Sequence, residues 1–511
     1  MTPVPGRLLA GLVTTLALLV AAPAEAAEVI VVGDGKAVRA DRPFVPLRAA
    51  SDLPAGARDP VAGIASTRAR SAVRARSSSK RARRATSRAL RRAYVRKAIS
   101  RGSYRKYVRI VARARKVRKR LEGARGRELG NAIALVDGMA LRRKLTASRM
   151  PALFLILRRN TQYWPRLPFP RDRDRVSFRG SRLLFEYYAG NGLQLQPLVN
   201  FKQANLMHGA CVKNTGVACD RRGLVRLLDE LARTASQRGG FKTWEYFFEF
   251  GGGIPPWISG MAQATAIQAL GRAYELLGDE RYLAQARAAF GAFDKASPVG
   301  VKTTGPFAGT HYLQYSFSPR LYIINAFLQT LIGLHDYAKI TGDATARRLF
   351  RAAEPEAREE LPANDTGDWS TYSYRGAEST REYHELLREM AAGMCSRLGR
   401  KVYCDASRSF LSYMTDPAEV ELLGPLTATK GVPTRVEFFV SKLSAVQVTI
   451  TRDGMVALDK LGTFRRGEGS FEWKPGAVGT YRIRVAVKEL RTGQGLRTSV
   501  TGQVESGPPV L

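Results

Sequence analysis

The sequence is short of acidic residues, cysteine and histidine, and each shortage restricts its chemistry. It has 44 Asp and Glu against 82 Lys and Arg, so its formal net charge is +38. The four cysteines show no CxxC-like spacing. His208, His311 and His335 do not recur at the intervals of metal ligands. We therefore expect no metal centre.

Nucleotide-binding loops and long apolar runs are lacking too. Gly33-Asp-Gly-Lys36 follows a strand-like run but lacks the rest of a P-loop, so we expect no nucleotide and no other cofactor. Beyond the N-terminus, no segment is long and apolar enough to span a membrane. With 45% hydrophobic and 25% charged residues, the composition is that of a globular protein, and the length favours two or three domains.

A signal peptide is predicted over residues 1–26. Arg7 supplies a positive charge, residues 8–22 are apolar, and Ala24-Glu25-Ala26 has the small-x-small pattern of a cleavage site. An uncleaved N-terminal anchor is the alternative. Export to an oxidising compartment favours two disulfides, Cys211 with Cys219 and Cys395 with Cys404. We therefore expect a secreted or cell-envelope protein.

The positive charge is concentrated between residues 61 and 150. This stretch holds 29 Lys and Arg against three acids, Glu122, Glu128 and Asp137, a net charge of +26. Such a basic arm attracts polyanions. In an exported protein we expect cell-envelope polyanions as partners and no nucleic acid in vivo. A solvated linker without a specific partner is the alternative.

Hydrophobic periodicity divides the chain into five parts. The fold predicted is mainly α: an (α/α) barrel of helical hairpins followed by an Ig-like β-sandwich. Residues 272–290 and 335–353 share one plan, a long helix, a Gly-Asp turn and an Ala/Arg-rich amphipathic helix, which indicates repeated hairpins. The parts are a signal peptide (1–26), a short strand and basic low-complexity linker (27–90), a basic helical segment (91–145), the barrel (146–415) and the sandwich (420–506).

Three stretches of the helical region are richer in aromatic and polar residues than packing requires. They are residues 243–274, 309–339 and 361–389. Trp257 follows a loop with three glycines and two prolines, so it is either a core residue or a platform on which a sugar stacks.

These stretches contain PPWISGMAQATAIQALGRAY, YSFSPRLYIINAFLQTLIGLHDYAKITGD, LPANDTGDWSTY with Arg375, and EYHELL. Over residues 186–396 the chain resembles, in the same order, the C-terminal catalytic domain of D-glucuronyl C5-epimerases. These enzymes convert glucuronate to iduronate units in heparosan-type chains, and their domain is an (α/α) barrel. The resemblance implies an acidic polysaccharide substrate.

The resemblance also implies site residues. Tyr372 and Tyr383 match the family's two acid/base tyrosines, Arg375 matches its arginine near the carboxylate, and Tyr315 matches a further site tyrosine. His384 is a binding neighbour. C5 epimerisation needs an acid/base on each side of the ring and a cation near the uronate carboxylate.

One position departs from the family pattern. The family glutamate before the tyrosine matched by Tyr315 is replaced by Gln314, which cannot take a proton. Either another carboxylate serves, with Glu245 and Glu249 as candidates, or only one face has a base.

The function expected is that of an exported uronyl C5-epimerase. The alternatives are a non-catalytic polysaccharide-binding protein of the cell envelope, and a lyase that shares the proton-abstraction step. A homodimer is a further option.

Overall fold

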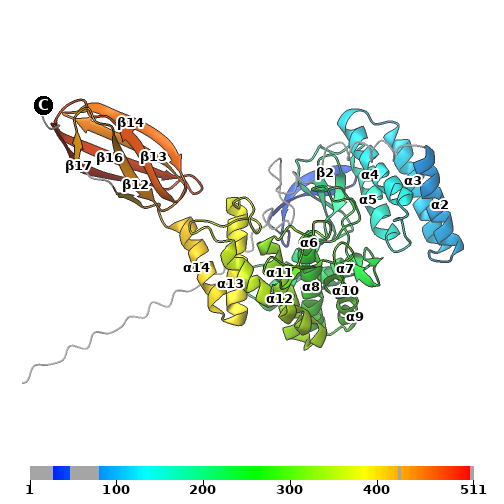
Figure 1. Cartoon of the computed structure of the whole chain (residues 1–511). Coiled ribbons are helices and arrows are strands. Elements are labelled where there is room, and N and C mark those ends of the chain that lie inside the picture. The colour runs from blue at the N-terminus through cyan, green and yellow to red at the C-terminus, as the bar shows by residue number, and fades with distance from the viewer. Residues whose placement is uncertain (1–26, 47–79, 424–426, 507–511) are drawn as a thin grey trace, which may run out of the picture.

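The computed structural model describes residues 27–46, 80–423 and 427–506. The predicted signal peptide and the linker residues 47–79 lie outside the described residues. Figure 1 shows helices α2 to α5 at one end of the molecule, the remaining helices in the middle, and a β unit beyond α14 at the other end.

A five-stranded sheet joins the N-terminal hairpin to the middle of the chain, in the order β2-β1-β3-β4-β5. The hairpin turns at Asp34 and Gly35, both with positive φ, which suits the right-handed twist of its strands. β1 then pairs in parallel with β3, with Ile30 opposite Val176. The strands are β1 (Ala27–Gly33), β2 (Lys36–Arg42), β3 (Arg175–Phe178), β4 (Leu184–Tyr188) and β5 (Gly192–Leu195).

Four helices follow, and most of the predicted basic segment lies in them. They are α2 (Lys80–Val95), α3 (Arg101–Arg118), α4 (Gly123–Leu141) and α5 (Met150–Tyr163). Tyr107 of α3 stacks on Phe154 of α5 with ring centroids 4.4 Å apart. Asp137 of α4 accepts hydrogen bonds from Thr86 at 2.5 Å and from Arg115 at 2.8 Å. The helical part therefore begins at Lys80, inside the predicted linker, because one face of α2 is buried.

The central helices pack around α8 and α11. Gly333 of α11 lies so close to α8 that a Cβ there would stand 2.5 Å from the carbonyl oxygen of Ala264. Gly278 and Gly342 end α8 and α11 in the left-handed conformation, and Asp343 caps α12. The elements are α6 (Pro197–Val212), α7 (Arg221–Ala232), α8 (Gly260–Leu277), α9 (Arg281–Arg287), α10 (Gly291–Asp294), α11 (Ile324–Thr341), α12 (Ala344–Ala363), α13 (Arg381–Leu398), α14 (Lys401–Thr415), and the hairpin strands β6 (Ser236–Arg238), β7 (Phe241–Thr243), β8 (Lys302–Thr304) and β9 (Thr310–Tyr312).

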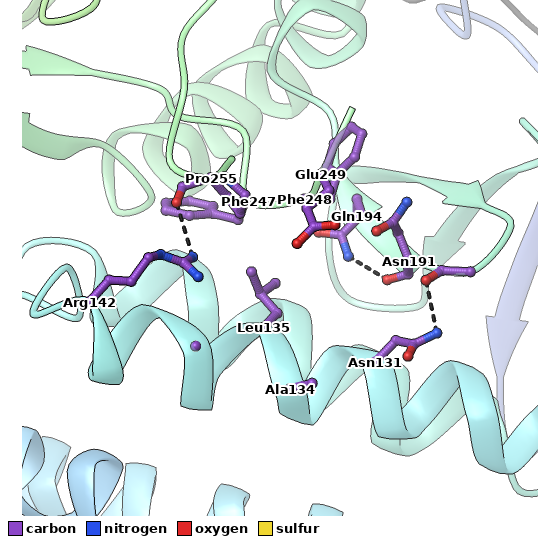
Figure 2. Close-up of a pocket in the computed structure, with 12 residues that line it drawn as sticks. Asn131, Ala134, Leu135, Arg142, Asn191, Gln194, Phe247, Phe248, Glu249 and Pro255 are labelled. Carbon is purple, nitrogen blue, oxygen red and sulfur yellow. Dashed lines mark hydrogen bonds between the residues drawn. The ribbon is translucent and has the colours of Figure 1, made fainter. Parts of the chain in front are cut away.

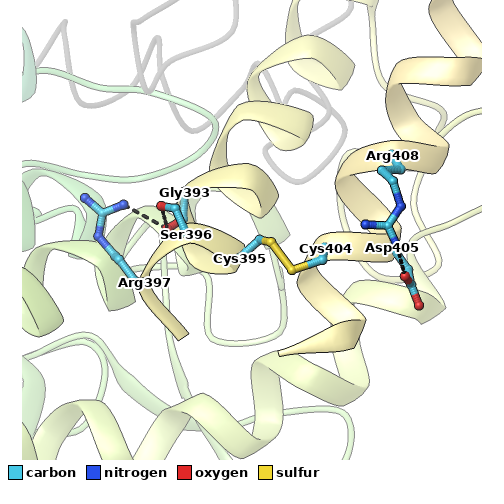
Figure 3. The surroundings of a disulfide bond; sticks show 7 residues. All are labelled: Gly393, Cys395, Ser396, Arg397, Cys404, Asp405 and Arg408. Carbon is cyan, nitrogen blue, oxygen red and sulfur yellow. Dashed lines mark hydrogen bonds and ion pairs between the residues drawn. A yellow bond between two sulfur atoms is a disulfide. The ribbon is translucent and has the colours of Figure 1, made fainter. Parts of the chain in front are cut away.

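Both predicted cysteine pairs form disulfides. Cys395 at the end of α13 is bonded to Cys404 in α14 (Figure 3), and Cys211 to Cys219 between α6 and α7. Among the helices described, none combines the length and apolar character needed to cross a bilayer.

The prediction of a mainly α fold is wrong. In the part of the chain that the structure describes, strands form five sheets, and the largest near the helices is the sheet of β1 to β5. The predicted (α/α) barrel is therefore not the architecture of this chain. β3, β4 and β5 have four or five residues and are almost entirely buried, so they lack the polar–apolar alternation of a half-exposed strand. Their partner β1 also lies about 140 residues earlier, and sequence patterns do not report such a pairing.

The C-terminal unit consists of two sheets, β10-β12-β15 and β11-β17-β16-β13-β14. A constant-type Ig domain divides its seven strands into four and three. Here the division is three and five, and β11 pairs in parallel with β17. The predicted Ig-like sandwich is therefore not supported. The strands are β10 (Val420–Leu422), β11 (Thr427–Thr429), β12 (Thr434–Val440), β13 (Ser444–Arg452), β14 (Met455–Phe464), β15 (Gly467–Trp473), β16 (Gly479–Glu489) and β17 (Gly495–Glu505).

Candidate active site

An aromatic cluster lies where β4, α8 and three loops meet. It is separate from the main core and draws on segments far apart in the sequence. Its large members are Tyr188, Tyr246, Phe248, Trp257, Tyr315 and Tyr372, with Phe250, Phe317 and Tyr383 packed against them. Trp257, Tyr315, Tyr372 and Tyr383, each singled out from the sequence, thus lie in one cluster.

Trp257 is fixed inside this cluster. Its backbone pairs with that of Tyr246, and the two rings stack 4.2 Å apart and 2° from parallel. Its indole Nε1 donates to the carbonyl of Phe248 at 2.9 Å. Only 1% of Trp257 is exposed, so of the two sequence-based interpretations the structure favours the core residue over the exposed sugar platform.

Tyr315 enters from the loop before α11. Its ring centroid lies 5.9 Å from that of Trp257 and 5.6 Å from that of Phe250. Ser316 holds this loop against Ile258 by two hydrogen bonds, Ser316 N to Ile258 O at 3.0 Å and Ile258 N to Ser316 Oγ at 3.1 Å. Gln314, next to Tyr315, is 2% exposed.

Tyr372 and Tyr383 come from the loop before α13 and from α13 itself. Their rings meet edge to face at 4.9 Å. The backbone N–H of Tyr372 donates to Ala377 O at 2.9 Å and closes a tight loop in which Arg375 has a φ of +54°. Arg375 is exposed, and its guanidinium lies over the ring of Tyr374 at 5.3 Å. Arg375 is therefore near the cluster in the chain but not a member of it.

His384 is held entirely by protein groups. Its Nδ1 is 2.7 Å from Ser370 Oγ, its Nε2 is 2.9 Å from Phe410 O, and its ring stacks on Trp369 at 3.8 Å. Burial lowers its pKa to about 4, so the ring is neutral at pH 7. In this arrangement His384 holds the loop against α13 and α14.

The two candidate carboxylates have different surroundings. Glu245 accepts two hydrogen bonds from Arg149, at 2.6 and 2.8 Å, and one from Arg238 at 2.9 Å. Such an ion pair leaves little capacity for proton transfer. Glu249 lines a small pocket of about 50 Å³ against α4, with Asn131, Asn191 and Arg142 (Figure 2).

The Glu249 side chain lines the pocket beside α4. Successive side chains of an extended segment point to opposite sides. Tyr246, Phe248 and Phe250 join the aromatic cluster, whereas Glu249 lines the pocket beside α4. Glu245 is thus engaged by two arginines, whereas the role of Glu249 as the second carboxylate stays a prediction.

Sequence reasoning missed one side of the cluster. Tyr188 ends β4, its ring stacks on Phe248 at 4.3 Å, and the guanidinium of Arg173 lies 4.3 Å over it. Burial alone would lower the pKa of Arg173, but the nearby Tyr188, Glu186 and Asp172 outweigh burial and raise it. Arg173 has a φ of +68°, a conformation that non-glycine residues adopt mainly where the surroundings impose it. No periodic signal marks it in the sequence.

Comparison with known proteins agrees with the cluster's position in the chain. Residues 238–412 match the family model described as D-glucuronyl C5-epimerase C-terminus. This segment is therefore similar to the C-terminal part of that epimerase family. Trp257, Tyr315, Tyr372 and Tyr383 lie inside the epimerase segment, whereas Tyr188 and Arg173 precede it. Among the described residues, no three potential metal-ligating side chains cluster.

Individual relatives cover only parts of the chain. A D-glucuronyl C5-epimerase of Caenorhabditis elegans is 33% identical over 135 residues, 24% of this chain and 22% of that protein. An uncharacterized protein of Methanocaldococcus jannaschii, MJ1128, is 28% identical over 169 residues, 32% of this chain and 55% of that protein. The chain thus spans about half or less of the length of these curated relatives. A sugar epimerase from a ruminal bacterium has 15% identity over 31% of this chain and 43% of its own, and its TM-score of 0.23 is too low to carry an argument.

Proposed function

We propose that this protein is an exported uronyl C5-epimerase that acts on glucuronate units of an acidic polysaccharide. One observation carries the proposal. Tyr315, Tyr372 and Tyr383 are far apart in the sequence, match the family's site tyrosines, and lie in one buried cluster within the epimerase segment. Two disulfides are compatible with secretion.

The reaction exchanges the proton on C5, next to the uronate carboxylate. On one side of the uronate ring, a tyrosine in its phenolate form accepts the C5 proton. On the other side, the hydroxyl of a second tyrosine donates a proton to C5. A cation must neutralise the carboxylate as negative charge spreads onto it. Arg173, over the ring of Tyr188, and Arg375, in the loop after Tyr372, are the two cations we assign to this role.

Gln314 favours a second candidate function. Without a carboxylate beside Tyr315, the chain could bind the polymer without turnover, or abstract the C5 proton and eliminate instead of reprotonating. Elimination yields an unsaturated uronate that absorbs in the ultraviolet. The three functions therefore give different products from the same incubation.

The test is incubation of heparosan with the full chain in deuterated water, followed by NMR at C5 of the uronate. We expect deuterium at C5, and a loss of about 100-fold or more in exchange rate with Tyr383→Phe, in the range that general acid–base groups contribute. Tyr322→Phe is the matched control, because the hydroxyl of Tyr322 binds Thr304 O outside the cluster. Binding without exchange would support the polysaccharide-binding protein, and ultraviolet absorbance would support the lyase.

A further inference from the structure

A second cavity lies on the N-terminal side of the molecule, between α3, α5 and the ends of β1 and β3. This basic groove has a volume of about 940 Å³. Six cations line it, from both helices and the sheet: Arg113, Lys116, Arg120, Arg159, Arg166 and Arg179. Asp34 is the acid among its lining residues, and it forms an ion pair with Arg179.

Most of these cations have no charge partner in the part of the chain that the structure describes. Among the residues described, no ion pair joins Arg113, Lys116, Arg120 or Arg166 to an acid. Arg113 and Lys116 share one face of α3, and Arg120 lies in the turn directly after the helix, where its N–H donates to Val117 O at 3.0 Å. At the helical rise the three positions span about 10 Å. Like charges this close repel one another, and a bound polyanion relieves the repulsion. A row of this length suits successive charges of a polymer better than a single small anion.

The groove is separate from the aromatic cluster, and β4 connects the two. Leu184, at the start of β4, pairs with Ser177 beside the groove, whereas Tyr188, at its end, belongs to the cluster. Four residues of strand separate them, about 13 Å at the usual rise of about 3.3 Å per residue.

We propose that the basic groove binds a stretch of acidic polysaccharide outside the active site. This inference rests on the proposed function for the identity of the polymer. A polymer held in the groove stays near the tyrosines, so that binding there raises the local concentration of uronate units.

The lining favours a glycan over a single-stranded nucleic acid. Proteins that bind single strands present aromatic rings on which bases stack. The groove's aromatic residue, Phe178, is 3% exposed and lies beneath the guanidinium of Arg159 at 4.3 Å. The remaining lining combines the cations and the polar Thr161 and Gln162 with apolar residues such as Val117, Leu121 and Leu167, and its polar part offers charge and hydrogen bonds to carboxylates and hydroxyls.

The test compares two charge-reversal variants of the full chain. The groove variant is Arg113→Glu/Lys116→Glu/Arg120→Glu, and the control is Arg88→Glu/Arg91→Glu/Arg92→Glu on the exposed face of α2. Both change the net charge equally within the same helical region. The probe is long heparosan at low and physiological salt, with a heparosan hexasaccharide as substrate.

We expect the groove variant to bind long heparosan at least tenfold more weakly at low salt, and the control to bind within twofold of the wild type. Hexasaccharide turnover should be unchanged in both. The uncharged variant Arg113→Gln/Lys116→Gln/Arg120→Gln should weaken binding in the same direction, which separates lost attraction from disturbed folding.

Equal weakening by groove and control variants, or no weakening by either, would overturn the proposal. So would groove-dependent binding of single-stranded DNA or anionic vesicles that is tighter than that of heparosan at the same salt. If wild-type protein binds heparosan through the groove but shows no C5 exchange, the epimerase proposal is wrong, whereas the proposal that the groove binds acidic polysaccharide is supported.

Discussion

At the scale of single residues, the family match and the structure assign different roles to His384. The match implies a group near the substrate. In the structure both ring nitrogens meet Ser370 and Phe410, and the ring covers Trp369. A buried neutral histidine with two partners ties together the elements it touches.

This position of His384 predicts a pH dependence of stability. Burial holds its pKa at about 4, whereas an unfolded chain titrates near pH 6.5. The unfolded chain therefore binds the proton first. The free energy of unfolding has its full value above about pH 6.5 and falls as the pH drops towards 4, by about 3 kcal/mol from this residue.

We expect the free energy of unfolding to fall between pH 7 and pH 4 by about 3 kcal/mol less in the His384→Gln variant than in the wild type. Urea unfolding at a series of pH values measures this difference. His335→Gln, at a partly exposed position, is the control. Equal pH slopes for wild type and His384→Gln would contradict the prediction.

At the scale of elements, α2 shows that much of the basic stretch is folded. Leu90 is 2% exposed and belongs to the main core with Tyr107 and Val111 of α3. One face of α2 carries this apolar contact, and the arginines occupy the others. Deleting the basic stretch as a linker would therefore uncover the core, which is why point substitutions are the better test of its charge.

We expect Leu90→Ala to lower the free energy of unfolding by about 2 to 4 kcal/mol, because it leaves a cavity in the core. Val95→Ala on the same helix, where the side chain is 68% exposed, should change it by less than about 0.5 kcal/mol. Denaturant unfolding measures both. If the two variants were equally stable, α2 would not be part of the cooperative core.

At the scale of the whole molecule, the C-terminal β unit contacts the loop that carries Tyr372 and Arg375. Arg491 pairs with Asp368 at 2.8 Å and with Glu378 at 3.1 Å, and it lies over the ring of Trp369 at 5.1 Å. Its side chain is only 10% exposed, and that of Asp368 is 6% exposed. The β unit thus supports the candidate site from outside it.

We expect Arg491→Ala to destabilise the protein by about 3 kcal/mol, because Asp368 would remain buried without this cation. Limited proteolysis should then cut the 365–380 loop faster, and C5 exchange should slow. Arg497 is exposed on β17, so Arg497→Ala should change neither the proteolysis of the loop nor the C5 exchange rate. Unchanged proteolysis of the Arg491 variant would mean that the β unit does not hold the loop.

Predictions from the sequence agree with the structure for features that depend on residues close together in the chain, such as helix ends and disulfide pairs. Gly278, Gly342 and Asp343 end and begin helices as their residue types predict. The disulfide partners lie eight and nine residues apart, close enough for their spacing to indicate the pairing. The pairing of strands into the sheet of β1 to β5 could not be predicted, because β1 lies far from β3 in the sequence.

The sequence by itself identified the segment similar to the epimerases and the tyrosines proposed for its site, because both depend on residue identity and order along the chain. Only the tertiary structure decided what surrounds them. It placed Tyr188 and Arg173 on the other side of the cluster, tied Glu245 to two arginines, and turned Glu249 towards α4. Several of these contacts, such as Tyr188 with Phe248 and Arg149 with Glu245, join residues about 60 to 100 positions apart, and their geometry follows from packing rather than from any local pattern.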